Sequence, residues 1–144
     1  MTTVLSDLAE IASAYRLVEV IAYEHSGRRE SPALEAESEQ EMSALVRREA
    51  GVLETRFRMT VRTRDAEMRS DVGAVFSSSE GHEVAAEAVG EFINQVGIMV
   101  VYPYLREGVF TSASRLGVSP PVLDLVRRGE ISFSSEPDQG GSGT

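Results

Sequence analysis

Residues 53–64 carry the pattern that most constrains the fold of this chain. Apolar or threonine side chains occupy every second position, and the positions between them hold four arginines, a glutamate and a threonine. A strict period of two is typical of a β-strand with one face in a core and the other toward solvent. A looser alternation at Met68–Phe76 follows a short turn at Asp65-Ala66, so the sequence predicts an antiparallel hairpin. In this hairpin Asp71 or Glu67 would lie beside the arginines.

Two further strands are predicted before this hairpin. Residues 14–25 are apolar and β-rich at both odd and even positions, which favours a strand buried on both sides. Residues 42–49 add another strand. The segment 26–41 between them contains five glutamates, a glycine and a proline, so we expect an exposed acidic crossover loop. Residues 5–12 fit a short helix or an arm.

A helical pattern begins after the hairpin. From Val84 to Val100, apolar residues recur at four-residue intervals with glutamates on the other side. Pro103 removes one backbone hydrogen bond, so we expect the run to bend or break near Met99 into two joined segments. Gly117 and the prolines that follow it indicate the helix end. The order of elements predicts an α+β fold, with a four-stranded antiparallel sheet and a long, proline-bent helix packed on one face.

The end of this helix carries a recognisable motif. Residues 102–107 read Y-P-Y-L-R-E, residues 111–117 read T-S-A-S-R-L-G, and Pro120-Pro121 follow. This order resembles the signature of SecB-type chaperones, in which F-P-Y-A-R-E precedes a T-S-x-x-S-R-G-like helix end and a proline turn. Tyr102 and Leu105 stand in place of the phenylalanine and the alanine of that signature. The resemblance implies the same sheet-and-helix fold and a homotetramer built as a dimer of dimers.

The resemblance also implies a function. SecB-type proteins are ATP-independent holdases that bind unfolded or nascent preproteins in apolar grooves, for Sec-dependent export with the motor SecA as a partner. Client-binding candidates are assigned by their position in the chain: Leu34, Met42, Leu45, Val46, Val118, Val122, Leu123 and Leu125. Candidates for a subunit interface are Leu17, Val18, Val20, Tyr102, Tyr104, Arg106 and Glu107.

Two other functions compete with general export. One is a SecB-like chaperone dedicated to a single partner, such as the antitoxin of a toxin–antitoxin system. The second amphipathic helix of typical family members is not apparent here, which makes this narrower role plausible. The other is a non-chaperone interaction domain or a module that binds a small ligand. A neighbouring toxin–antitoxin gene pair would favour the dedicated chaperone, and a small molecule bound in the core would favour the last function.

Composition limits the remaining classes of fold and function. A chain of 144 residues fits one domain, expected at 1–133, with a disordered tail at 134–144 that has no large apolar side chain. The net charge of −9 argues against nucleic acid as a partner. The chain has no cysteine, no long apolar run and no signal-peptide pattern, so a cytoplasmic protein without membrane insertion is expected. His25 and His82 are interpreted as exposed surface residues, and we expect no metal, no cofactor and no enzymatic activity.

Overall fold

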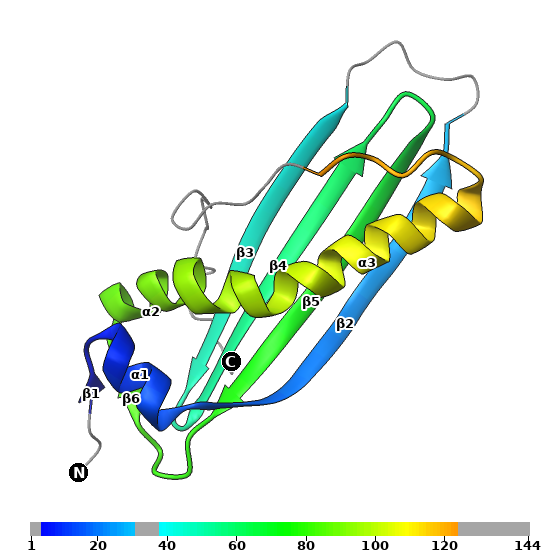
Figure 1. The fold of residues 1–144 in the computed structure, drawn as a ribbon. Coiled ribbons are helices and arrows are strands. Elements are labelled where there is room, and N and C mark those ends of the chain that lie inside the picture. The colour runs from blue at the N-terminus through cyan, green and yellow to red at the C-terminus, as the bar shows by residue number, and fades with distance from the viewer. Residues whose placement is uncertain (1–3, 31–37, 124–144) are drawn as a thin grey trace, which may run out of the picture.

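The computed structural model describes residues 4–30 and 38–123, which form a four-stranded antiparallel sheet with helices along one face (Figure 1). The strands of this sheet are β2 (Arg16–Arg29), β3 (Glu39–Glu49), β4 (Val52–Arg62) and β5 (Ala66–Ser77), in the spatial order β2-β5-β4-β3. The helices are α1 (Leu8–Ala14), α2 (Ala86–Phe92), the π-helix η1 (Ile93–Gly97) and α3 (Ile98–Leu116). Two short strands, β1 (Val4–Leu5) and β6 (Glu83–Val84), pair in parallel beside them. The predicted α+β fold is confirmed.

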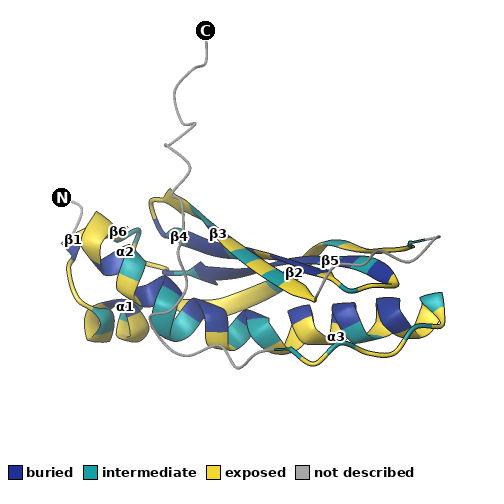
Figure 2. Cartoon of the chain, turned by 90° about the horizontal axis from the view of Figure 1, so that it is seen from above, coloured by how far each residue is buried: buried dark blue, intermediate teal, exposed yellow. Residues whose placement is uncertain are grey.

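The core lies between the sheet and the helices, as the band of buried residues in Figure 2 shows. The predicted alternation of β4 is confirmed, because Leu53, Phe57 and Met59 are fully buried while Arg58 is exposed. β5 is buried on both of its faces. The helical run contributes fully buried side chains at regular spacing: Phe92, Ile93, Ile98, Val101, Leu105 and Val109.

The prediction that residues 14–25 are buried on both sides is wrong for this chain. β2 is an edge strand, and most of its residues are exposed (Figure 2). Its register against β5 shifts between Leu17 and Glu19 and again between Ala22 and Glu24. Each shift adds a residue, so that Leu17 and Val20, of opposite parity, both lie on the helix-facing side. The mixed parity of the apolar residues therefore reflects two irregularities and not two covered faces.

The predicted crossover loop at 26–41 is too long at both ends. β2 continues to Arg29 and β3 starts at Glu39. The polar residues at these ends belong to edge strands, where charged side chains find cross-strand partners and water. Arg28, for example, lies opposite Glu67 of β5 and forms an ion pair with it at 3.0 Å. Strand formation here follows from pairing with β5 and not from apolar content.

Pro103 lies inside α3 and does not divide the helix at Met99. The change in backbone hydrogen bonding occurs earlier, in the π-helical turn Ile93–Gly97, and the helical run from α2 through α3 is continuous (Figure 1). The predicted helix end is confirmed. Gly117 caps α3 in the left-handed region at φ 70°, and the Arg29 guanidinium donates a hydrogen bond to the Leu116 carbonyl at 3.2 Å. None of the helices in the described parts of the chain is long and apolar enough to cross a membrane.

Candidate functional site

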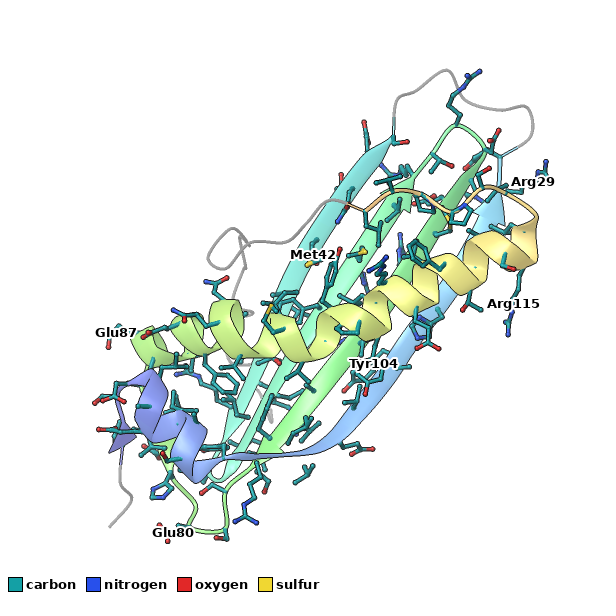
Figure 3. The ribbon with its side chains drawn as sticks, in the orientation of Figure 1. Arg29, Met42, Glu80, Glu87, Tyr104 and Arg115 are labelled. Carbon is teal, nitrogen blue, oxygen red and sulfur yellow. The ribbon has the colours of Figure 1, made fainter. Side chains whose placement is uncertain are left out.

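Four of the predicted client-binding residues pack against the core between the sheet and the helices. Met42 and Val46 are on β3 at positions that pair with the helix-facing residues Met59 and Thr55 of β4. Figure 3 shows Met42 on β3. Both side chains are partly buried against the core, as are Val118 and Leu123 in the segment that follows α3. Met42 and Val46 form an apolar surface on β3, which we call the β3 surface. Val118 follows the end of α3, where the Leu116 carbonyl contacts Arg29 of β2, at the opposite edge of the sheet.

The other client-binding candidates do not join this surface. Leu45 has the opposite parity and pairs with Arg56, so it lies on the face of the sheet away from the helices. Val122 is 96% exposed. Leu34 and Leu125 fall outside the described residues. Of the predicted set, only Met42 and Val46 are shown to share one surface, on β3.

The backbone of β3 adds a second feature to the β3 surface. β3 is the last strand in the order β2-β5-β4-β3, and it pairs with β4 along all eleven of its residues. Its outer edge has no strand partner within the described residues. An edge of this length presents a row of backbone donors and acceptors on which an extended peptide can form a further strand.

Five of the seven predicted interface residues lie on the β2 side of α3: Leu17, Val18, Val20, Tyr104 and Glu107. Leu17 and Val18 of β2 are 47% and 60% exposed, and Tyr104 of α3 is 45% exposed. Between β2 and α3 runs a groove of about 520 Å³, which we call the β2–α3 groove. Val20, Tyr104 and Glu107, all predicted, line this groove.

Tyr102 and Arg106 do not line the groove. In an α-helix, residues two positions apart point about 200° from one another, so Tyr102 and Tyr104 project on different sides of α3. Tyr102 is partly buried against the core, and the Arg106 guanidinium lies 5.0 Å from the centre of the Phe110 ring. The predicted interface set is therefore divided between two sides of one helix.

The β2–α3 groove also contains residues that the sequence analysis did not select. His25 hydrogen-bonds through Nδ1 to the hydroxyl of the fully buried Ser70, at 2.9 Å. The imidazole lies against Gly108, where a Cβ atom would approach Nδ1 to 2.2 Å. His25 therefore lies at the contact between β2 and α3. His82, the other histidine, has a side chain only 14% exposed, so the interpretation of it as an exposed residue is wrong.

Arg115 is a further unpredicted residue of this groove, at its end near the C-terminus of α3 (Figure 3). Tyr104, Glu107, Gly108, Thr111 and Arg115 follow the three- and four-residue spacing of one helix stripe. That spacing was readable in the sequence. What was not readable is that β2 lies beside this stripe.

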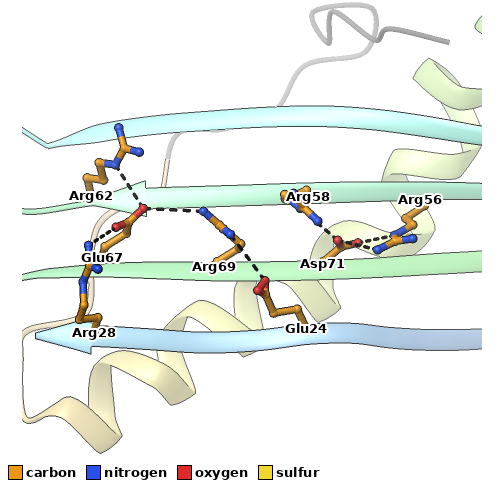
Figure 4. Close-up of polar contacts among 8 residues, drawn as sticks. All are labelled: Glu24, Arg28, Arg56, Arg58, Arg62, Glu67, Arg69 and Asp71. Carbon is orange, nitrogen blue, oxygen red and sulfur yellow. Dashed lines mark hydrogen bonds and ion pairs between the residues drawn. The ribbon is translucent and has the colours of Figure 1, made fainter. Parts of the chain in front are cut away.

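The face of the sheet away from the helices carries an ion-pair network (Figure 4). Asp71, whose side chain is 2% exposed, accepts hydrogen bonds from Arg56 at 2.8 and 3.0 Å and from Arg58 at 3.1 Å. Glu67 pairs with Arg62 at 3.3 Å and with Arg28. The predicted positions of Asp71 and Glu67 beside the arginines are therefore confirmed. These arginines are neutralised by carboxylates of the same chain, which supports the interpretation of a solvated, internally balanced face.

Tyr23 belongs to the same network. Its hydroxyl donates a hydrogen bond to Glu54, and Arg56 stacks on its ring at 3.8 Å from the centre. Burial, followed by the hydrogen bond to the Glu54 carboxylate, raises the pKa of Tyr23 above its ordinary value of 10.0. The hydrogen bond to Asp71 is the largest cause that raises the pKa of Arg56. Both shifts stabilise the protonation states that the network has at neutral pH.

No group of three or more His, Cys, Asp or Glu residues that could hold a metal ion occurs in the described parts of the chain. The arrangement consists of an apolar surface beside a free strand edge and, on the opposite side of the helix, a groove of mixed polarity. Such surfaces bind polypeptide segments.

Comparisons with known proteins agree with this description. No protein-family model matches the chain. It is 33% identical over 132 residues to the SecB-like chaperone SmegB of Mycolicibacterium smegmatis, an alignment that covers 92% of this chain and 89% of SmegB. Among solved structures, it is similar to the SecB-like chaperone Rv1957 of Mycobacterium tuberculosis, solved in complex with a ChAD peptide from the Rv1956 HigA1 antitoxin. That match has a TM-score of 0.70 and 19% identity, and it covers 83% of this chain and 92% of the other.

Proposed function

Because the chain belongs to the SecB-like chaperone family, we propose that it is an ATP-independent holdase that binds an unfolded polypeptide along the β3 surface. The observation that carries this proposal is the position of Met42 and Val46 on the helix-facing side of β3, whose outer edge has no strand partner within the described residues. An extended client would pair its backbone with the edge strand and bury every second side chain against these residues. Burial of apolar surface needs no nucleotide.

We further propose that the client is one dedicated partner of the antitoxin type. The specific observation in favour is that the solved SecB-like chaperone of the same fold carries an antitoxin-derived peptide. General export, with SecA as a partner, is the competing form of the same activity. In both forms the protein works as a multimer, because Leu17, Val18 and Tyr104 leave large apolar side chains exposed on the β2 side of α3.

The β3 surface is tested by two neighbouring substitutions on one strand. Met42→Asp places a charge on the helix-facing side, whereas Ser43→Asp places the same charge on the opposite, exposed side. We expect wild type and Ser43→Asp to delay aggregation of an unfolded client without nucleotide, and Met42→Asp to lose at least about tenfold in client affinity. Thermal unfolding of each variant shows whether the fold is intact. A second substitution, Leu123→Asp, tests the segment after α3, which packs against the same core.

Client range distinguishes the two forms of the activity. Protection of one genetically linked partner, without protection of several unrelated unfolded proteins, supports the dedicated chaperone. Protection of all of them supports the general holdase. If the wild-type protein protects none, the holdase proposal is wrong and a non-chaperone interaction domain replaces it.

A further inference from the structure

β3 carries two charges of opposite sign that have no oppositely charged partner within the described residues. Glu41 is exposed on the face of the sheet away from the helices, and it forms no hydrogen bond or ion pair with any described residue. Arg48 is exposed on the helix-facing side, where its guanidinium donates a hydrogen bond to the Val84 carbonyl at 3.3 Å but has no described carboxylate within 4.0 Å. The other charged residues of β3 are paired: Glu39 with Arg62, and Arg47 with Glu49 and Glu54.

These two charges flank the apolar pair of the β3 surface. Met42 directly follows Glu41, and Val46 lies two residues before Arg48. Glu41 and Arg48 are seven residues apart, which corresponds to about 24 Å along an extended strand. A client strand paired with the outer edge of β3 would therefore pass both charges and both apolar side chains within one short segment.

We propose that β3 selects its client by charge order and direction, binding an antiparallel segment in which an acidic residue precedes a basic residue by seven positions. This inference rests on the proposed binding of clients to the β3 surface and names the class of segment bound there. In an antiparallel pair, directly opposite residues lie on one face of the sheet. The acidic residue then faces Arg48 and the basic residue faces Glu41. Apolar residues two and six positions after the acidic residue face Val46 and Met42.

Charge pairing and strand direction both favour this order. The hydrogen bond to Val84 leaves Arg48 with donors for a carboxylate, because a guanidinium has five N–H groups. Opposite charges directly across two strands attract and like charges repel, so exchange of the two client charges replaces two attractions with two repulsions. A segment with its basic residue first could satisfy both charges only in the parallel direction, and parallel pairing is slightly less stable per residue.

A second copy of β3 does not meet these requirements. Two copies of β3 paired side by side about a two-fold axis keep their helix-facing sides on the same face of the joined sheet. Glu41 and Arg48 point to opposite faces, so they cannot lie directly opposite one another in such a pair. A client strand whose acidic and basic residues also point to opposite faces satisfies both charges. Charge complementarity therefore favours a client segment over self-association at this edge.

Three synthetic peptides test charge order and direction. The first contains E-T-V-T-S-T-V-R between serine flanks, the second exchanges its glutamate and arginine, and the third is the first in reverse order. We expect wild-type protein to bind the first about tenfold more tightly than the second, and more tightly than the third, as measured by fluorescence anisotropy. At about 1 M salt, where the screening length is about 3 Å, the difference between the first and the second should fall below about threefold.

A charge exchange on the protein tests the same contacts from the other side. Glu41→Arg/Arg48→Glu should reverse the preference, so that the second peptide binds more tightly than the first. Glu91→Arg/Arg64→Glu is the matched control, because it makes the same two charge changes at exposed positions outside β3 and should keep the wild-type preference. Thermal unfolding checks that both variants are folded.

The outcomes separate this inference from the holdase proposal. Equal binding of the first two peptides to wild type, with both weakened by Met42→Asp, would overturn the charge selection and leave the β3 surface as the client site. Binding of the third peptide at least as tight as that of the first would overturn the antiparallel direction. If no peptide binds although wild type delays client aggregation, clients bind elsewhere and the charge selection is wrong. A wild-type protein that neither binds the peptides nor delays aggregation would overturn the holdase proposal as well.

Discussion

Asp71 provides the strongest test of how the open face of the sheet is stabilised. Its buried carboxylate accepts two hydrogen bonds from Arg56, at 2.8 and 3.0 Å, and one from Arg58, at 3.1 Å. Asp71→Asn keeps the size of the side chain but removes its charge. It also replaces one acceptor oxygen with an NH2 group, which donates toward arginine groups that donate as well.

The expected loss of stability follows from the number of hydrogen bonds that Asp71 accepts and from the exposure of the two arginines that donate them. Hydrogen bonds to charged groups contribute about 1.5–3 kcal/mol each, and removal of one partner of a buried ion pair costs about 3–5 kcal/mol. The side chains of Arg56 and Arg58 are 32% and 49% exposed, so water replaces some of the hydrogen bonds that they lose with the carboxylate. We therefore expect Asp71→Asn to lower the free energy of unfolding by about 2–4 kcal/mol.

Glu39→Gln is the matched control for this change. Glu39 lies 3.9 Å from Arg62, and both side chains are about half exposed or more, at 61% and 48%. Exposed pairs of this kind contribute about 0–1 kcal/mol, so the control should change stability by less than about 0.5 kcal/mol. Urea unfolding at one fixed protein concentration measures both variants, and equal m-values confirm comparable unfolded states. If Asp71→Asn is no more destabilising than Glu39→Gln, the network does not stabilise the sheet as argued.

Two further predictions concern groups on either face of the sheet. Gly108→Ala should destabilise the protein by about 1 kcal/mol, although alanine favours helices, because the new Cβ would displace His25 from the buried Ser70 hydroxyl. In a His25→Ala background the loss should be smaller but should not vanish, because the new Cβ would still lie 2.6 Å from the Ser70 hydroxyl, as thermal unfolding would show. The raised pKa of Tyr23 stabilises the fold fully below about pH 10, and this contribution is lost as pH rises through the raised value. Tyr23→Phe should therefore reduce the alkaline loss of stability in a pH series, and an unchanged profile would contradict the assignment.

The central hairpin was predictable because local pattern and tertiary environment agree there. The alternation of β4 assigns its two faces, and a short turn places β5 beside it, so Asp71 and Glu67 reach the arginines. The same parity argument, applied to β3, separates Met42 and Val46 from Leu45. Position along the chain alone put these three residues in one set, and strand parity would have divided it.

The β2 side of the molecule was less predictable, because its features depend on contacts between distant segments. Two register shifts mix the parity of β2, and no local signal marks where they occur. His25 is exposed, as the sequence predicts, but its contacts with Ser70 and with Gly108, which is distant along the chain, could not be read from the sequence. The groove therefore exists only after β2, β5 and α3 have packed together.

The two proposals place client binding and self-association on opposite sides of α3. The β3 surface lies at one edge of the sheet and the β2–α3 groove at the other, with α3 crossing the sheet between them (Figure 1). Met42 belongs to the first and Tyr104 to the second, so a client on β3 need not displace a second copy from β2. Assembly then places several β3 surfaces in one particle, and weak contacts to one long client add up through effective concentration. Val18→Asp, at an exposed apolar position of β2, should accordingly weaken retention of a long client more than binding of a short peptide, since only the long client spans two subunits.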